Sequence, residues 1–389
     1  MGRQYDVVVF GATGFAGRLT AEYLAQTAPP DCTWAIAGRS SGKLAAVRDE
    51  LAAGNPALAD LPLLHAAADD AGSLRALAES TRVLITTVGP YVLYGDELVA
   101  ACAAAGTDYL DLTGEPEFVD RCYVRHHEKA VESGARIVHC AGFDSIPHDL
   151  GAYFTVLQLP ADVPITVSGY VRASMMISGG TFATILTGFG RARQNLAAHR
   201  ERRAVEQPTA AGRRVRARAG RPGRDPVDGG WAMPFPSLDP QIVGRSARAL
   251  ERYGPDFRYA HHVSVPHLYT AVGGAAGLVA LAGAAQVPPA RRALQQRLQP
   301  GDGPSAEKRA RSWFTVSFVG EGGGERVVTR VSGGDPGYGE TAKMLGESAL
   351  CLAYDDLPGT AGQVTTATAM GEHLIDRLHK AGIGFDVIG

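Results

Sequence analysis

Residues 5–17 read YDVVVFGATGFAG, and this stretch decides the fold of the first part of the chain. The apolar run Tyr5–Phe10 leads directly into a glycine-rich turn, and apolar side chains then recur at helical spacing. Strand, glycine turn and helix in this order are typical of a dinucleotide-binding βαβ unit. Gly11 permits a tight turn, Gly14 lets a pyrophosphate approach the backbone, and Gly17 lets the helix pack close to the strand. The stretch therefore predicts a phosphate site at the start of this helix.

The end of the second predicted strand, Thr33–Ala37, indicates which dinucleotide binds. Gly38, Arg39 and Ser40 follow it, where an NAD site usually has Asp or Glu for the ribose 2′-hydroxyl and where arginine suits a 2′-phosphate. A guanidinium can bind phosphate through two hydrogen bonds, so we expect NADP(H) as the cofactor. The residues predicted to bind it are Gly11, Ala12, Thr13, Gly14, Phe15, Gly17, Arg39, Ser40, Lys43, Asp69, Val88, Gly89, Pro90, Gly114 and Phe143.

Length, charge and cysteine content narrow the class of protein. A chain of 389 residues is long enough for two domains with sizeable cores, and its formal net charge of −2 argues against a general nucleic-acid binder. The five cysteines form no C-x-x-C pair, which predicts reduced thiols in a cytoplasmic protein and no metal site. The first strand begins almost at the first residue, so no signal peptide is expected.

Strands and helices alternate through the first part of the chain. Further strands are predicted at 63–67, 82–88, 107–112 and 136–141, and helices at 95–105 and 116–133. Six strands with crossover helices predict an α/β fold with a doubly wound parallel Rossmann sheet.

The pattern changes near residue 160. A half-buried strand at 165–171, a helix at 181–199 and a hairpin at 313–331 predict an inserted α+β domain. We therefore expect three parts, namely an NADP-binding Rossmann domain at 1–159, a substrate and catalytic α+β domain at 160–336, and C-terminal helices at 337–389 that return to the Rossmann domain.

Two segments allow alternative interpretations. Residues 200–224 contain nine arginines and two glutamates, which predicts a mobile surface loop or, as the sharper alternative, a docking patch for an acidic partner. Residues 268–287 carry no charge and are long enough to span a bilayer. Because Ala and Gly dominate there, we expect a buried helix or tunnel wall, with peripheral contact to a membrane or lipid as the alternative.

Catalytic candidates follow the fourth and sixth predicted strands, because ligands of such sheets bind outside the carboxyl ends of the strands. Tyr91 and Tyr94 can donate a proton, and Asp144 and His148 can support or relay one. Alternatives remain for three of the four: Tyr91 as a wall of the nicotinamide site, Asp144 as a helix cap and His148 as a packed residue. No tyrosine stands four residues before any lysine, which excludes the Tyr-x-x-x-Lys mechanism of short-chain reductases.

Eight motifs, in this order, resemble the saccharopine dehydrogenase-like superfamily, and within it the actinobacterial branch of trans-acting enoyl reductases. They are GATGFAG (11–17), AGRS (37–40), TVGPY (87–91), DLTGE (111–115), GFDSIP (142–147), SGGT (178–181), GDPGY (334–338) and ATAMG (367–371).

The resemblance implies an NADPH-dependent enoyl reductase acting on an unsaturated acyl thioester of polyketide or lipid biosynthesis. The alternatives are a saccharopine-type C–N oxidoreductase and a non-catalytic NADP-binding protein on lipid surfaces. The expected partners are an acyl or small-molecule substrate, an acyl carrier domain that presents it, and a second copy of the chain in a homodimer.

Overall fold

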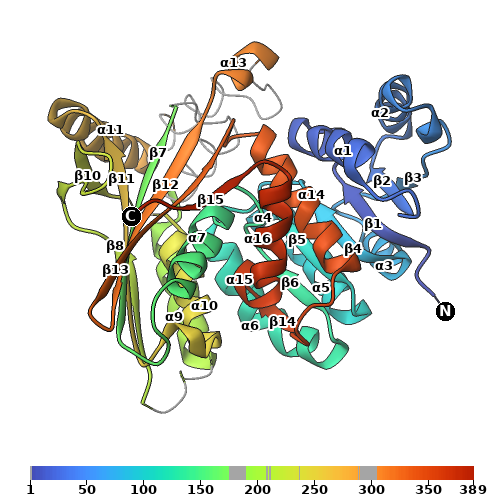
Figure 1. The fold of residues 1–389 in the computed structure, drawn as a ribbon. Coiled ribbons are helices and arrows are strands. Elements are labelled where there is room, and N and C mark those ends of the chain that lie inside the picture. The colour runs from blue at the N-terminus through green and yellow to red at the C-terminus, as the bar shows by residue number, and fades with distance from the viewer. Residues whose placement is uncertain are drawn as a thin grey trace. The chain divides into compact units, whose positions relative to one another are not determined.

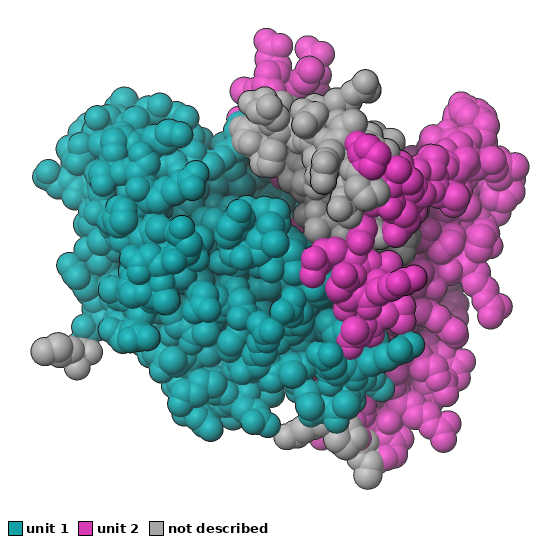
Figure 2. Space-filling view, turned by 180° about the vertical axis from the view of Figure 1, so that it is seen from behind, with its two compact units in different colours: residues 1–143, 198–205, 338–381 teal, residues 144–197, 206–337, 382–389 magenta. Residues whose placement is uncertain are grey.

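The computed structural model describes residues 2–174, 190–206, 209, 212–235, 237–287, 289 and 305–389. The chain forms two compact units (Figure 2), each built around one sheet (Figure 1). The first unit contains residues 1–143, 198–205 and 338–381, and the second contains 144–197, 206–337 and 382–389.

The sheet of the first unit has seven strands, all parallel, in the order β14-β6-β5-β4-β1-β2-β3. The order reverses beside β1, and ligands of such sheets bind at the carboxyl edge of that switch point. Val7, Val8 and Val9 of β1 are fully buried, as expected for a strand covered on both faces. The strands are β1 (Tyr5–Phe10), β2 (Trp34–Gly38), β3 (Leu63–His65), β4 (Thr81–Thr86), β5 (Asp108–Asp111), β6 (Arg136–Val138) and β14 (Gly362–Val364).

Helices cover both faces of this sheet. α3, α5 and α6 pack side by side, and their apolar side chains share a core with β1, β4 and β5. α14 packs on β1, β4 and β5 and against α1. The helical elements of this unit are α1 (Phe15–Thr27), α2 (Ser41–Gly54), η1 (Pro56–Leu58), α3 (Ala71–Ser80), α4 (Tyr91–Tyr94), α5 (Asp96–Ala105), α6 (Pro116–Ser133), α14 (Gly339–Tyr354), α15 (Thr366–Ala369) and α16 (Gly371–Lys380).

The second unit is built around an eight-stranded mixed sheet in the order β15-β13-β12-β7-β11-β10-β9, with β8 also paired to β11. β11 runs parallel to β7 and β8, whereas the β12–β13 hairpin and β15 are antiparallel to their neighbours. The strands are β7 (Ile165–Ala173), β8 (Arg214–Ala219), β9 (Gly223–Arg224), β10 (Trp231–Pro234), β11 (Asp256–Val265), β12 (Phe314–Gly322), β13 (Glu325–Gly333) and β15 (Gly384–Val387).

Helices α7 and α10 of the second unit pack on this sheet. α7 packs on β7, β12 and β13, and α10 packs on β8, β11 and α7. The helical elements are α7 (Ile146–Leu157), α10 (Asp239–Ala249), η2 (Glu251–Tyr253), α11 (Leu268–Gln286) and α13 (Ala306–Ala310). α9 (Ala192–Val205) begins in this unit, and its residues from Ala198 onward belong to the first.

The predicted domain boundaries differ from the observed units in two places. The first boundary was predicted after residue 159, but the chain leaves the first unit after Phe143 because α7 packs on the second sheet. Residues 337–389 were predicted to return as a whole, but the final segment, from Gly382, joins the second unit because β15 pairs with β13. Much of the predicted helix at 181–199, and the SGGT motif, lie outside the described residues.

The prediction of a mobile loop at 200–224 is wrong. Arg202 is buried and pairs with Asp120 of α6 at 2.6 Å. Arg213 donates to the carbonyl oxygens that end α10, including Ala247 O at 2.8 Å and Leu250 O at 2.9 Å. The following residues form β8, whose arginines alternate with smaller residues that pack toward α10. The described residues of this segment therefore include part of α9 and all of β8, and Arg202 and Arg213 have partners that the composition does not reveal.

The prediction of a buried helix or tunnel wall at 268–287 is also wrong. Among the described residues, α11 is the one helix long and apolar enough to cross a membrane, with a mean hydropathy of 1.6 and 11% of that stretch buried. Only Ala271 and Ala285 of α11 are buried. Most of this helix therefore faces outward.

Candidate cofactor and substrate site

The three glycines of the first turn are required for different reasons. Gly11 has φ +92°, and a Cβ there would lie 2.8 Å from both Thr87 Oγ1 and Val88 Cγ2. A Cβ on Gly17 would lie 2.3 Å from Gly11 O, so α1 could not pack against the turn. Gly14 has an ordinary φ of −82°, and its Cβ would meet only Gly11 O, at 3.4 Å. Its other side is open, which fits the close approach of a pyrophosphate.

The start of α1 offers backbone N–H groups to an anion. Gly14 caps the helix and, as a glycine, makes no side-chain hydrogen bond to the N–H groups at this end. Helix N-termini carry partial positive charge and unpaired donors, so this end can bind phosphate. Of the neighbouring residues predicted to bind the cofactor, Ala12 is buried, Thr13 is exposed and Phe15 packs edge-on against Tyr338, with ring centroids 4.7 Å apart.

The end of β2 carries the residues predicted to select NADP(H). Arg39 directly follows β2 and is exposed, and Ser40 is the half-buried residue before α2. Lys43 is exposed in the first turn of α2, and Asp69 is exposed after β3. No carboxylate stands directly after β2, so the position that holds Asp or Glu in an NAD site is cationic here.

The loop after β4 carries Val88, Gly89 and Pro90, and it leads into α4 with the two candidate tyrosines. The Tyr91 side chain is buried, and its hydroxyl donates to Thr86 O and accepts from Leu112 N, both at 3.2 Å. Tyr94 is 47% exposed. The Tyr91 hydroxyl therefore already has backbone partners, whereas the Tyr94 residue is about half exposed.

The loops after β5 and β6 complete this edge of the sheet. Gly114 is half-buried between β5 and α6, and Phe143 N donates to Thr341 Oγ1 at 3.1 Å. Glu115 is buried, and its carboxylate accepts from the backbone N–H groups of Tyr91 and Val92. Burial raises the pKa of the Glu115 carboxyl group above its usual range.

The other two catalytic candidates, Asp144 and His148, belong to the second unit. The His148 side chain lies with Asp239 and His261 in the buried interior of that unit; each imidazole Nε2 is within 3.7 Å of a carboxylate oxygen of Asp239. Burial lowers the pKa of His148 to about 3 and that of His261 to about 4. Both imidazoles are therefore neutral near pH 7.

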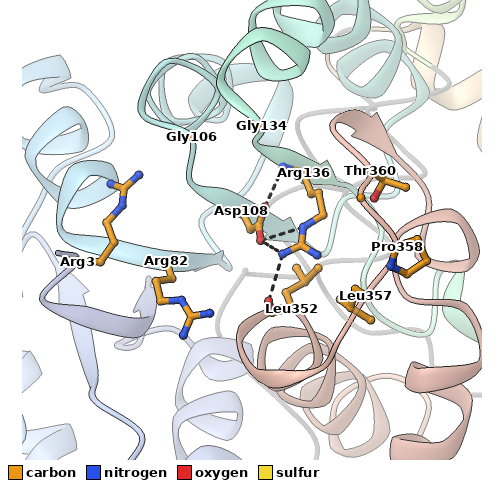
Figure 3. A pocket seen from close by; sticks show the side chains of 11 residues that line it. Arg3, Arg82, Gly106, Asp108, Gly134, Arg136, Leu352, Leu357, Pro358 and Thr360 are labelled. Carbon is orange, nitrogen blue, oxygen red and sulfur yellow. Dashed lines mark hydrogen bonds and ion pairs between the residues drawn. The ribbon is translucent and has the colours of Figure 1, made fainter. Parts of the chain in front are cut away.

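A cavity of about 360 Å³ lies at the opposite, amino edge of the first sheet (Figure 3). It is lined by Arg3, Arg82 and Arg136, among others. These arginines donate to carbonyl oxygens at helix ends, for example Arg136 to Leu352 O at 3.1 Å, and Arg136 also pairs with Asp108 (Figure 3). The arginine side chains therefore cap the C-terminal ends of helices. The cavity lies away from the carboxyl edge of the sheet, which is the edge expected to bind the cofactor and is called the cofactor edge below.

Sequence reasoning missed the buried residues behind the cofactor edge. Asp111 and His139 lie at the ends of β5 and β6, where the His139 Nδ1 is 2.6 Å from Asp111 Oδ2. Asp111 belongs to the DLTGE motif, so its position at the end of a strand was a usable signal. His139 carried none, because a single histidine after an apolar strand has no distinguishing spacing.

Comparisons with known proteins agree with this arrangement. Residues 7–138 match the saccharopine dehydrogenase NADP-binding domain family. The chain is 35% identical to a trans-acting enoyl reductase of Mycobacterium ulcerans and 36% identical to one of Mycobacterium tuberculosis, and each alignment covers 98% of this chain and 97% of the relative.

A solved structure shares the fold over nearly the whole length. The saccharopine dehydrogenase (L-Glu forming) of Saccharomyces cerevisiae has a TM-score of 0.55 at 10% identity, covering 99% of this chain and all of that one. The predicted Rossmann fold with a second α+β domain, and NADP(H) as the cofactor, are confirmed. The chain is an NADP-dependent oxidoreductase that belongs to the trans-acting enoyl reductase family within the saccharopine dehydrogenase-like proteins.

Proposed function

We propose that this protein is an NADPH-dependent enoyl reductase that acts on an unsaturated acyl thioester. The observation that carries the proposal is full-length similarity to trans-acting enoyl reductases, together with a glycine turn and a cationic β2 end that suit NADP(H). Bound NADPH supplies a hydride to the β-carbon of the substrate. The protein must then supply a proton to the α-carbon and a hydrogen-bond donor to the developing enolate oxygen.

Of the candidate donors, Tyr94 suits the proton step better than Tyr91. The Tyr91 hydroxyl is held between two backbone groups, so it serves as a wall of the nicotinamide site. Tyr94 lies one turn further along α4 and is exposed. Asp144 and His148 remain the proposed supporting residues, with His148 in its neutral form.

Turnover with a defined thioester tests the proposal. Crotonyl- and longer enoyl-pantetheine substrates are incubated with NADPH, and loss of the reduced nicotinamide absorbance is followed together with mass spectrometry of the product. Formation of the saturated thioester supports enoyl reduction. Turnover only with an imine or amino acid would favour a C–N oxidoreductase, and NADPH binding without any turnover would favour a non-catalytic protein.

The exposed face of β8 suits an acidic carrier domain. Arg214, Arg216 and Arg218 alternate along the strand and are exposed, and Arg258 of β11 lies in register with Arg216. We call these four residues the basic strip. Its charge is partly offset by Asp256, which pairs with Arg258 at 3.3 Å and lies 3.7 Å from Arg216. The exposed arginines of the strip can attract an acidic acyl carrier domain.

Reversing Arg214, Arg216 and Arg218 to Glu is expected to lower kcat/KM for carrier-bound substrate about tenfold or more at low salt. The rate with a pantetheine-linked substrate should not change, because that substrate carries no acidic surface. Added salt should reproduce the loss in the unmutated protein, since exposed charges are screened over about 8 Å at physiological ionic strength. Arg213 is left in place because it holds the end of α10.

A control variant reverses two exposed arginines of α9, Arg193 and Arg200, which lie outside the basic strip. This variant should keep its rate with both substrates. Equal effects of the strip variant on carrier-bound and pantetheine-linked substrates would remove the carrier-docking proposal.

The exposed helix α11 suits a lipid surface as the source of a long-chain substrate. Tyr269, Val272 and Val279 are 73%, 59% and 74% exposed, and the helix has no charged residue. A helix that is apolar on all sides and not buried exposes a patch that water solvates poorly. Insertion into a lipid surface covers every side that the protein leaves open.

Replacing Val272 and Val279 with Glu is expected to abolish co-sedimentation with phosphatidylcholine vesicles and to leave NADPH affinity unchanged. Leu196→Glu on α9, also an exposed apolar residue, is the control and should bind vesicles normally. If the double variant instead converts a dimer to a monomer in lipid-free buffer, α11 pairs with a second copy of the chain and the lipid proposal fails.

A further inference from the structure

Two buried carboxylates stand behind the loops of the cofactor edge and take no part in the chemistry proposed above. Asp111, the last residue of β5, is fully buried, and Glu115, just before α6, is 7% exposed. Burying a carboxylate costs free energy unless hydrogen-bond donors surround it. The partners of these two groups therefore indicate what the carboxylates are for.

Asp111 binds the first residues of two loops. Its Oδ1 accepts from the backbone N–H groups of Thr113 and Cys140, both at 3.0 Å. Its Oδ2 accepts from the Tyr109 hydroxyl at 2.9 Å and lies 2.6 Å from His139 Nδ1. One carboxylate thus joins the start of the loop after β5 to the start of the loop after β6.

The loop after β6 has a backbone conformation that needs such support. Cys140 has φ +62°, a left-handed conformation that residues other than glycine seldom adopt. Its N–H is held by Asp111, and Ala141 N donates to Asp111 O at 2.7 Å. Unfavourable backbone conformations persist where surrounding contacts over-determine them.

Glu115 binds the start of α4, the helix that follows the loop after β4. Its two carboxylate oxygens accept from Tyr91 N at 3.0 Å and Val92 N at 2.8 Å. The Tyr91 hydroxyl in turn accepts from Leu112 N in the loop after β5. The loops after β4, β5 and β6 are consequently joined by one set of buried and partly buried hydrogen bonds, all within the first unit.

We infer that Asp111 and Glu115 are positioning residues that hold these three loops in the shape that receives the nicotinamide ring of NADPH. The glycine turn and Arg39 hold the rest of the cofactor, the 2′-phospho-ADP-ribose. The inference depends on NADP(H) as the cofactor and on nicotinamide binding at this edge, but not on an enoyl substrate. A binding experiment can therefore fail or succeed independently of the proposed reaction.

Asp111→Asn and Glu115→Gln keep side-chain shape but replace one acceptor oxygen with an NH₂ donor that faces another donor. In each variant, the Kd of NADPH should rise about tenfold or more, because the nicotinamide loops lose their preformed arrangement. The Kd of 2′-phospho-ADP-ribose, which lacks nicotinamide, should change less than about twofold, since its contacts lie elsewhere. Both constants are measured by isothermal titration calorimetry on the full chain.

Matched controls separate this role from a general effect on stability. Asp108→Asn changes a buried carboxylate on the same strand at its amino end, where it pairs with Arg136. Glu117→Gln changes a buried carboxylate of the first turn of α6 that pairs with Arg121 at 3.1 Å. Both controls should leave the ratio of the two dissociation constants unchanged, even where they lower Tm.

If Asp111→Asn and Glu115→Gln weaken the binding of NADPH and of 2′-phospho-ADP-ribose equally, or weaken the binding of neither, the inference is overturned. If either variant does not fold, Tyr91→Phe decides the question, because it removes only the hydroxyl that joins the loops after β4 and β5. The same selective rise in the Kd of NADPH, by several-fold, is then required. An unchanged ratio in a folded Tyr91→Phe protein would overturn the inference as well.

Discussion

Gly14→Val is expected to abolish NADPH binding while the protein keeps its fold. The φ of Gly14 is −82°, and a Cβ would meet only Gly11 O at an ordinary distance, so the backbone accepts valine. The branched side chain would occupy the space that the pyrophosphate needs. Loss of two charge-assisted hydrogen bonds alone raises Kd about 100-fold or more. Calorimetric titration with NADPH and a thermal melt measure the two properties.

Two other glycines serve as controls for Gly14. Gly54, at the end of α2, also has open space around its would-be Cβ, so Gly54→Val should bind NADPH normally. Gly17→Val should destabilise the fold itself, because its Cβ would lie 2.3 Å from a backbone oxygen. Normal NADPH binding by Gly14→Val would show that the turn is not the phosphate site.

Arg39→Ala is expected to weaken the binding of NADPH far more than the binding of NADH. Only NADPH carries the 2′-phosphate, and losing one charge-assisted contact to it costs about 1.5–3 kcal/mol, which corresponds to about a 10- to 150-fold rise in Kd. Arg39 is exposed directly after β2, so its removal should leave the fold intact. Titration of each variant with both cofactors gives the selectivity ratio.

Arg48→Ala is the matched control for Arg39. It removes a positive charge from α2, where Arg48 pairs with its neighbour Asp49 at 2.9 Å. Its ratio of NADPH to NADH affinity should equal that of the unmutated protein. If Arg39→Ala reduces both affinities by the same factor, the assignment of Arg39 to the 2′-phosphate is wrong.

The strands and helices of the first unit could be predicted because the sequence signals that mark their ends are local. β1 has the predicted bounds, Tyr5–Phe10, and α6 has the predicted bounds, Pro116–Ser133. In both cases a long apolar or periodic run ends at glycine or proline, which fixes the ends of an element. β14, in contrast, is three residues long and pairs with β6 from far along the chain. A strand this short has no pattern of its own and forms only because the sheet edge is present.

The arginine-rich segment shows why composition alone was misleading. Arg202 and Arg213 are charged, yet one pairs with a buried carboxylate and the other with carbonyl oxygens at the end of α10. Their partners lie on other elements, so no window of sequence contains the interaction. The same limit applies to the site. The glycines and Arg39 are identified by spacing, whereas the role of Asp111 depends on amides from two separate loops.

The way the chain passes between its two units limits how it can be divided into fragments. It crosses after residues 143, 197, 205, 337 and 381, so neither unit is a continuous piece of sequence. The segment that matches the NADP-binding domain family, 7–138, lacks α14, whose buried Met344 and Leu345 belong to the cover of β1, β4 and β5. Expressed alone, that segment would present a bare hydrophobic sheet face to water and would aggregate. Co-expression of this segment with a separate fragment that carries α14 should cover that face and yield the first unit in soluble form.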